Sequence, residues 1–169
     1  MSQIAVIITD LFEDSEYTEP ANAFRAAGHD LVHVGLKAGA TVYGKKDNTA
    51  VTIERAVRDV AAAQFDALLI PGGYSPDKLR VDDDAVRFAG DFVRSGKPVF
   101  AICHAAQLLI TADVLRGRKM TGYKSIVQDL KNAGVEYFDQ EVVEDDQLVS
   151  SRHPGDLPAF ISAALRHLG

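Results

Sequence analysis

Short apolar runs alternate with amphipathic stretches along most of the chain. Continuous apolar runs predict buried strands, whereas apolar residues at helical spacing predict helices that cover a core. The predicted strands cover residues 4–9, 31–34, 67–70, 98–102, 135–143 and 148–151. The predicted helices cover residues 16–27, 82–95, 105–111, 125–132 and 157–168. Gly28 and Gly96 directly follow two of these helices, as expected of residues that end a helix.

The alternation of strands and helices determines the expected architecture. Apolar strands that alternate with helices form a mostly parallel sheet, covered on both faces and connected by right-handed crossovers. We therefore expect an α/β protein, a flavodoxin-like three-layer sandwich around a mostly parallel central sheet. Residues 41–43 and 52–53 flank the polar segment 44–48, which predicts a small hairpin added to the main sheet. No linker or repeat divides the chain, so residues 1–169 are expected to form a single domain.

Composition and charge argue against several classes of binding partner. The chain has 18 basic and 24 acidic residues and no basic cluster along one face, which argues against nucleic acid binding. No apolar stretch is long enough to span a bilayer and no signal-peptide pattern is present, so we expect a cytoplasmic protein without a membrane partner. A lone cysteine allows no internal disulfide and no multi-cysteine metal site, and no pair of histidines has a spacing typical of zinc. We expect neither a metal nor a cofactor.

The single cysteine, Cys103, lies where an apolar strand is expected to turn abruptly into a helix. The small flanking residues Ala101 and Ala105 suit the sharp turn on which enzymes hold a nucleophile. The N–H groups and the dipole at a helix start favour thiolate, so we expect the pKa of this thiol to be lowered. The alternative is a cysteine buried for packing alone, because cysteine is among the most commonly buried residue types.

Three strand ends are expected to form one site. In a parallel sheet of this class, functional groups gather beyond the carboxyl ends of the strands. The loops that follow Thr9, Ile70 and Ile102 should therefore lie together. This placement would bring an acidic loop and a glycine-rich loop next to Cys103.

The acidic loop, residues 10–16, has four acids in seven positions. Glu13 and Asp14 are expected to act as electrostatic caps of the helix that follows. Glu16 either caps the same helix or points inward. An inward Glu16 beside Cys103, kept dry by apolar neighbours, would have a raised pKa and could exchange a proton with the thiol or a substrate oxygen.

The glycine-rich loop begins with Pro71 and contains Gly72 and Gly73. Paired glycines form either a simple tight turn or a place of close backbone approach. In the second case, the amides of Gly73 and His104 could both donate to a developing oxyanion. The loop lacks the spacing of a dinucleotide-binding fingerprint, which excludes a nicotinamide or flavin at this point.

Two histidines are candidates for the chemistry. His104 directly follows Cys103, but adjacent side chains on a helix normally diverge, so adjacency alone does not make it a base. His153 precedes a proline, which favours an extended backbone. We expect His153 to project from the last strand toward the site or toward a subunit interface.

Several motifs are together characteristic of a known family. They are Phe12–Glu16 with Pro20, Ile70–Gly73, Ala101–His104 with Gln107–Leu109, Leu115–Arg118 and Val149–Arg152. Over essentially the whole chain they resemble the PfpI-type intracellular cysteine peptidase and deglycase family. This family belongs to the parkinsonism-associated deglycase superfamily and is related in fold to class I glutamine amidotransferases.

The resemblance implies a role for each candidate. Cys103 would be the nucleophile, Glu16 the acid that touches its sulfur, and His104 the partner base. Gly73 and His104 would supply the oxyanion amides. In peptidase-like members an acid from a neighbouring subunit orients the histidine, and the matching position here is Asp77.

The chain departs from the family pattern at two places. The family prototype has Glu where this chain has Asp77, whose shorter side chain needs closer subunits to reach His104. Asp77 follows a proline, so its alternative role is to start a short helix. The family commonly has Gly-Pro after Cys-His, whereas this chain has Ala105 and Ala106.

Two function classes follow from these residues. The first is a cysteine-dependent hydrolase active in stress response, either on methylglyoxal and its early adducts on proteins and nucleotides or on peptides. We favour the small carbonyl because a nucleophile on a compact sheet beside the Gly73 loop suits a small substrate. The second is an oxidative-stress sensor or chaperone in which Cys103 is oxidised to sulfinic acid. Relatives of this kind associate as homodimers or as hexamers of dimers, so we expect self-association.

Overall fold

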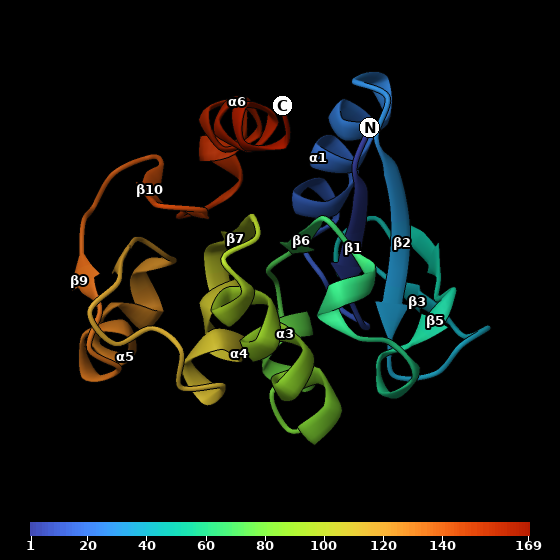
Figure 1. The fold of residues 1–169 in the computed structure, drawn as a ribbon, viewed down its shortest axis with the longest axis horizontal. Helices are drawn as coiled ribbons and strands as arrows, with labels where there is room; N and C mark the ends of the chain where they lie inside the picture. Colours follow the sequence, from blue (N-terminus) through green and yellow to red (C-terminus); the bar gives the residue numbers. More distant parts are fainter.

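The computed structural model describes all 169 residues, and a seven-stranded sheet runs through its centre (Figure 1). In spatial order the strands are β10 (Val143–Asp145), β11 (Leu148–Ser151), β7 (Val99–Ile102), β6 (Ala67–Ile70), β1 (Gln3–Ile7), β2 (Asp30–Gly35) and β5 (Arg55–Ala56). Every neighbouring pair is parallel except β10 and β11. The predicted α/β class with a mostly parallel sheet is confirmed.

Helices cover both faces of the sheet. They are α1 (Asp14–Ala26), α2 (Ser75–Leu79), α3 (Asp83–Ser95), α4 (Ala106–Thr111), α5 (Val127–Asn132) and α6 (Leu157–Leu168). Figure 1 shows α1 and α6 on one side of the sheet, with α3 and α4 on the other. None of the helices combines the length and the hydropathy that a membrane crossing requires. Single 3-10 turns lie at Val57–Asp59, Ala62–Gln64, Cys103–Ala105, Lys124–Ile126 and Pro154–Asp156.

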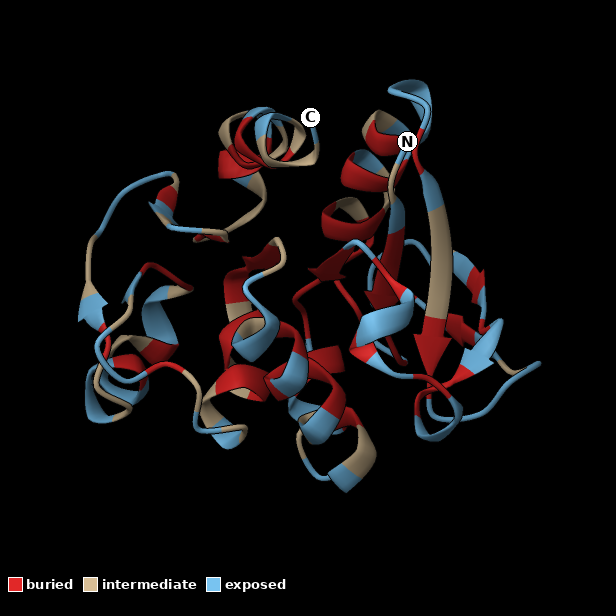
Figure 2. Ribbon diagram, viewed as in Figure 1, coloured by how far each residue is buried: buried red, intermediate tan, exposed pale blue.

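The strands are buried on both faces, which explains their continuous apolar runs. In β1, Ile4 and Val6 pack into the core under α1 and α6, whereas Ala5 and Ile7 pack into the core under α3 and α4. Figure 2 shows the central strands as buried and the outward helix faces as exposed. The alternation of side chains along each strand therefore fills two separate cores from one sheet.

The predicted hairpin is present, but it does not join the main sheet. Its strands β3 (Thr41–Tyr43) and β4 (Ala50–Thr52) form a separate antiparallel pair. The short strand β5 occupies the position beside β2 instead. Val42 and Val51 are buried against the core under α1, so side-chain packing rather than a backbone ladder attaches the hairpin.

The predicted strand over residues 135–143 is wrong. Only β9 (Glu136–Tyr137) is extended and paired, with β8 (Lys119–Met120), and β10 begins at Val143. The residues between them, 139–141, are polar and exposed, and they have no ladder partner. A polar segment that cannot bury a face does not extend a buried sheet.

Replacing Phe24 with alanine should lower the free energy of unfolding by about 3–5 kcal/mol, because it leaves a cavity under α1. Phe24 is fully buried and its ring centroid lies 5.8 Å from that of Phe100. Urea unfolding followed by circular dichroism measures this loss. The matched control is Val81→Ala, because Val81 is 84% exposed and its truncation should change stability by less than about 0.5 kcal/mol. Equal losses in the two variants would contradict this view of the core.

Candidate active site

The loops after β1, β6 and β7 meet at one edge of the sheet, as the topology predicts. Phe12 and Gly73 form an isolated β-bridge, and the amide of Tyr74 donates to the Leu11 carbonyl at 2.8 Å. The amide of Glu13 donates to the Gly72 carbonyl at 3.2 Å. The expectation that these loops lie together is confirmed.

Cys103 stands on a strained turn between β7 and α4. Its φ is 63°, in the left-handed region, which costs a residue other than glycine about 1–2 kcal/mol. The residue begins a single 3-10 turn, and its side chain is almost entirely buried. Ala105 is fully buried directly below the turn, so a larger side chain has no room there. The sharp turn predicted from the flanking alanines is present.

The two glycines of the second loop allow close backbone approach. Gly73 has φ of 76°, and a Cβ there would lie 2.6 Å from the Leu11 carbonyl oxygen. A Cβ on Gly72 would lie 2.8 Å from the Cβ of Cys103 and would overlap the Glu16 carboxyl. The paired glycines therefore form a close backbone approach rather than a simple tight turn.

Glu16 points inward and does not cap the helix. Its side chain is fully buried, and its Oε1 accepts a hydrogen bond of 2.9 Å from the Gly72 amide. Oε2 has no hydrogen-bond partner. The Cys103 side chain interacts with this carboxyl and lowers its pKa. The unpartnered Oε2 leaves room for a proton on the carboxyl.

Burial and, to a smaller extent, the negative charge of Glu13 raise the pKa of Glu16 to about 8. The hydrogen bond from Gly72 and the interaction with Cys103 act in the opposite direction, but burial dominates. Glu16 is therefore protonated at neutral pH, as the sequence predicts for an inward carboxyl.

The expectation of a lowered thiol pKa is wrong. Burial and the charge of Glu16 raise the pKa of Cys103 to about 12. The amides of Gly73 and His104 do donate to the sulfur and lower the pKa of Cys103, as expected of a helix start, but they do not offset the burial. The following helix, α4, has only six residues, so its dipole adds little.

Glu16 and Cys103 titrate as a pair. Because Glu16 is protonated below about pH 8, its charge opposes the thiolate only above that pH. At neutral pH the pair therefore holds both protons. A nucleophilic sulfur then requires a base that takes the thiol proton at the moment of attack.

His104 is placed to be that base. Its Nδ1 lies 3.2 Å from the Cys103 sulfur, and its Nε2 lies 3.1 Å from the Ser125 hydroxyl. Its ring stacks on Tyr123 with a centroid distance of 4.8 Å. Burial lowers the pKa of His104, so the ring is neutral at neutral pH and free to accept a proton. The positive φ of Cys103 rotates the two adjacent side chains together, which a regular helix would not do.

Ser125 is a site residue that sequence reasoning missed. It lies 21 positions beyond His104, in the turn before α5, and no local pattern marks it. Asp77 is exposed on α2 and forms no hydrogen bond with His104 of the same chain, although its charge raises the pKa of that histidine. Within one chain the orienting partner of His104 is therefore Ser125. The role of Asp77 across a subunit interface stays a prediction.

Glu13 and Asp14 lie at the start of α1, as expected of electrostatic caps, but neither side chain makes a capping hydrogen bond. Glu13 is buried between Lys45 and Lys46, at 2.9 and 3.1 Å from their ammonium nitrogens. Asp14 accepts hydrogen bonds from the amides of Lys46 and Thr49, at 2.9 and 3.1 Å. Both acids thus hold the hairpin turn against the site, which is a long-range contact that the helix-start pattern does not reveal.

His153 lies beside the site rather than in it. Its Nδ1 accepts a hydrogen bond of 3.1 Å from the Gly155 amide and so caps the turn Pro154–Asp156. Pro154, not His153, lines the cavity above Cys103. The expected projection of His153 into the site is therefore not observed.

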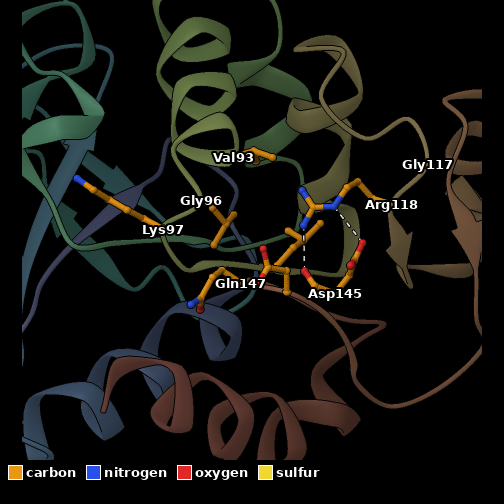
Figure 3. Close-up of a pocket in the computed structure, with 10 residues that line it drawn as sticks. Val93, Gly96, Lys97, Gly117, Arg118, Asp145 and Gln147 are labelled. Carbon is orange, nitrogen blue, oxygen red and sulfur yellow. Dashed lines mark hydrogen bonds and ion pairs between the residues drawn. The ribbon is translucent and has the colours of Figure 1, made fainter.

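Two cavities at different places on the sheet are lined by different kinds of residue. A cavity of about 430 Å³ is lined by Glu13, Lys45, Lys46, Gly73, Tyr74, Cys103, His104, Tyr123 and Pro154. Another cavity, of about 260 Å³, lies where β7 begins and is drawn in Figure 3. There Arg118 forms an ion pair with Asp145 at 3.0 Å, so its positive charge is already balanced. No cluster of three or more His, Cys, Asp or Glu side chains could hold a metal ion.

Comparisons with known proteins agree with this geometry. The DJ-1/PfpI family matches residues 2–167. Protein/nucleic acid deglycase 2 of Escherichia coli is 61% identical over 168 residues, which are 99% of this chain and 98% of that protein. General stress protein 18 of Bacillus subtilis is 56% identical over 159 residues, 94% of this chain and 92% of that protein.

A solved structure is also similar over the whole chain. It is a two-domain protein from Anabaena variabilis with DJ-1/ThiJ/PfpI-like and ferritin-like domains. The TM-score is 0.97 at 38% identity, and the match covers 100% of this chain. This chain spans 48% of that protein's length.

The infrared carbonyl stretch of a protonated carboxyl should disappear with a midpoint near pH 8 in the wild type and be absent from Glu16→Gln. Since the pKa of Glu16 in the folded protein exceeds its ordinary value of 4.5, the unfolded chain loses this proton first. The free energy of unfolding should therefore fall, relative to Glu16→Gln, as the pH rises from about 4.5 to about 8. Difference spectra and urea unfolding across this range measure the two effects.

The Cys103→Ala variant is the control for this titration. It keeps the buried pocket but removes the interaction that lowers the pKa of Glu16, so the midpoint should rise. A wild-type midpoint near that of an exposed glutamate would show that Glu16 is hydrated and would contradict the proposed protonation state.

Proposed function

The chain belongs to the DJ-1/PfpI family, and on that premise we propose that it is a cysteine-dependent enzyme of stress response. Its substrate is methylglyoxal or an early adduct of methylglyoxal on proteins and nucleotides, and the product is lactate. The name of the E. coli relative, a protein/nucleic acid deglycase, supports this choice of substrate.

One observation carries the proposal. The proposal is supported by the groups around the Cys103 sulfur, which are suited to act as a neutral base, two amide donors and a protonated acid. The base is His104, the amides are those of Gly73 and His104, and the acid is Glu16. A buried cysteine that serves packing alone has no need of any of these groups.

In the first step the sulfur attacks the aldehyde carbon of methylglyoxal while its proton passes to Nδ1 of His104. The carbonyl oxygen gains negative charge, which the amides of Gly73 and His104 stabilise before Glu16 supplies a proton. Such donors are typically worth about 3–4 kcal/mol each in the transition state. The result is a hemithioacetal on Cys103.

In the second step Glu16, now ionised, takes the hydrogen from the carbon that carries sulfur. Glu16 delivers this hydrogen to the adjacent carbonyl carbon, and the hydroxyl hydrogen moves to the oxygen on that carbon. These transfers convert the hemithioacetal into a lactoyl thioester. Water then cleaves the thioester and releases lactate; the proton held on His104 restores the thiol, and the proton released with lactate returns to Glu16. On an adduct, the amine or thiol of the modified molecule leaves when the sulfur attacks.

The cavity favours a small substrate. Its volume of about 430 Å³ lies at the lower end of the range for ligand pockets, and Cys103 is part of its wall. We propose that peptide hydrolysis is at most a minor activity of this site. We further propose that the chain self-associates as a homodimer or a hexamer of dimers, in which Asp77 of one copy approaches His104 of another. Sedimentation velocity tests this assembly, and a monomer would contradict it.

Wild-type protein should convert methylglyoxal to lactate, and Cys103→Ala should reduce kcat/KM to background because the thioester cannot form. Glu16→Gln keeps the shape of the site but removes the transferable proton, so kcat should fall about 10²- to 10⁴-fold. Enzymatic lactate determination measures both effects. Ser125→Ala should lower kcat more than it changes KM, because Ser125 orients His104 and lies outside the substrate cavity.

The control variant for this series is Arg118→Gln, at the cavity drawn in Figure 3, which should retain wild-type turnover. A fluorogenic peptide assayed in parallel tests the peptidase alternative. Turnover of the peptide with no lactate from methylglyoxal would overturn the carbonyl substrate, and full activity in Cys103→Ala would overturn the nucleophile.

A second candidate function is supported by the protonated Glu16 beside the sulfur. A sulfinic acid on Cys103 could accept a hydrogen bond from this carboxyl, which would stabilise an oxidised, sensing form. Intact-mass measurement after mild peroxide treatment tests it. Stoichiometric gain of two oxygen atoms in a protein that does not consume methylglyoxal would favour the sensor over the enzyme.

A further inference from the structure

Two lysines cover the mouth of the cavity, and neither has a role in the proposed mechanism. Lys45 and Lys46 lie in the turn between β3 and β4, and both line the cavity that contains Cys103. The turn is fixed in place, because the Lys45 amide donates to the Phe12 carbonyl at 2.9 Å and the Lys46 amide donates to Asp14 at 2.9 Å. The position of the two ammonium groups is therefore built into the fold.

Among the side chains that line the cavity, two ammonium groups face one carboxylate, because Asp14 lies outside the lining and binds backbone amides of the turn. Glu13 is buried and its two oxygens lie 2.9 Å from Lys45 and 3.1 Å from Lys46. One carboxylate thus holds two ammonium groups, which leaves a net charge of one positive unit. Glu16 adds no negative charge at neutral pH, because it is protonated.

Lys45 is the more enclosed of the two. Its side chain is 29% exposed, compared with 64% for Lys46, and its ammonium lies 5.2 Å from the centroid of the Tyr74 ring. Its charge lowers the pKa of Cys103, Glu16 and His104, so it acts electrostatically on all three groups around the reacting sulfur. A lysine ammonium has three donors, and Glu13 is the one acceptor within reach of Lys45.

We propose that Lys45 and Lys46 form an anion subsite that, among the substrates proposed above, favours adducts carrying a carboxylate or phosphate over free methylglyoxal. The inference rests on the proposed function and specifies its substrate class. Glu13 positions the two ammonium groups on the wall of the cavity, and the free donors of Lys45 bind the anion. The anion's charge then fixes which carbonyl carbon meets the sulfur.

The subsite can be tested without turnover by alkylating Cys103. Iodoacetate and iodoacetamide have the same reactive carbon and differ in charge, so the ratio of their rates reports the field at the sulfur. Any change in the pKa of Cys103 cancels from this ratio, since both reagents consume the same thiolate. In Lys45→Gln the ratio of the iodoacetate to the iodoacetamide rate should fall about three- to tenfold, and added salt should lower the wild-type ratio.

Three further variants make the result specific. Lys45→Arg keeps the charge and should keep the wild-type ratio, whereas Lys46→Gln should lower it less than Lys45→Gln because Lys46 is more exposed. Lys119→Gln removes an exposed lysine beside Arg118, near the start of β7, and should leave the ratio unchanged. An equal ratio in the wild type and Lys45→Gln would overturn the subsite.

Protection from iodoacetamide distinguishes the kind of anion. Inorganic phosphate and acetate are compared with chloride at equal ionic strength. Stronger protection by phosphate assigns the subsite to phosphate-bearing substrates, stronger protection by acetate assigns it to carboxylates, and protection by neither overturns it. Failure of the proposed function is seen in a different measurement. The wild type would then form no lactate from methylglyoxal, while the alkylation ratio would still test the subsite.

Discussion

The candidate site depends on the close approach of three backbone segments around one buried carboxyl. The Gly72 amide donates to Glu16 at 2.9 Å, and Gly72 also lies against the Cβ of Cys103. Any side chain at Gly72 would separate the acid from the sulfur. Because Phe12 and Gly73 bridge the same two loops, the backbone holds Glu16 at the sulfur without a charged partner. Close backbone packing is thus the condition for the proton chemistry proposed here.

This packing has an electrostatic consequence. A carboxyl and a thiol that share a dry pocket both keep their protons more strongly than in water, so both groups are protonated in the resting site. Neutral His104 is then the group that can accept the thiol proton, which allows the sulfur to attack. Such a site spends little of its time as thiolate, which limits unwanted reaction of the cysteine.

The hairpin turn extends the site beyond the sheet. The flavodoxin-like core supplies Cys103, Glu16 and the oxyanion amides, whereas β3 and β4 supply positive charge from a separate small sheet. Asp14 and Glu13 connect the two parts, one through the backbone of the turn and the other through its lysines. The helix start that carries Glu16 therefore also carries the acids that place the cations, so one short segment organises both halves of the cavity.

The sequence alone determined the order of the longer strands and helices, the meeting of three loops and the position of Cys103, because apolar periodicity and strand ends are local features. Family motifs further pointed to Glu16 and Gly73. The tertiary structure alone decided the hairpin's separate sheet, the contact of Ser125 with His104, and the placement of Lys45. It also reversed the expected shift of the thiol pKa. Burial depth and contacts between distant segments set these properties, and no local pattern encodes them.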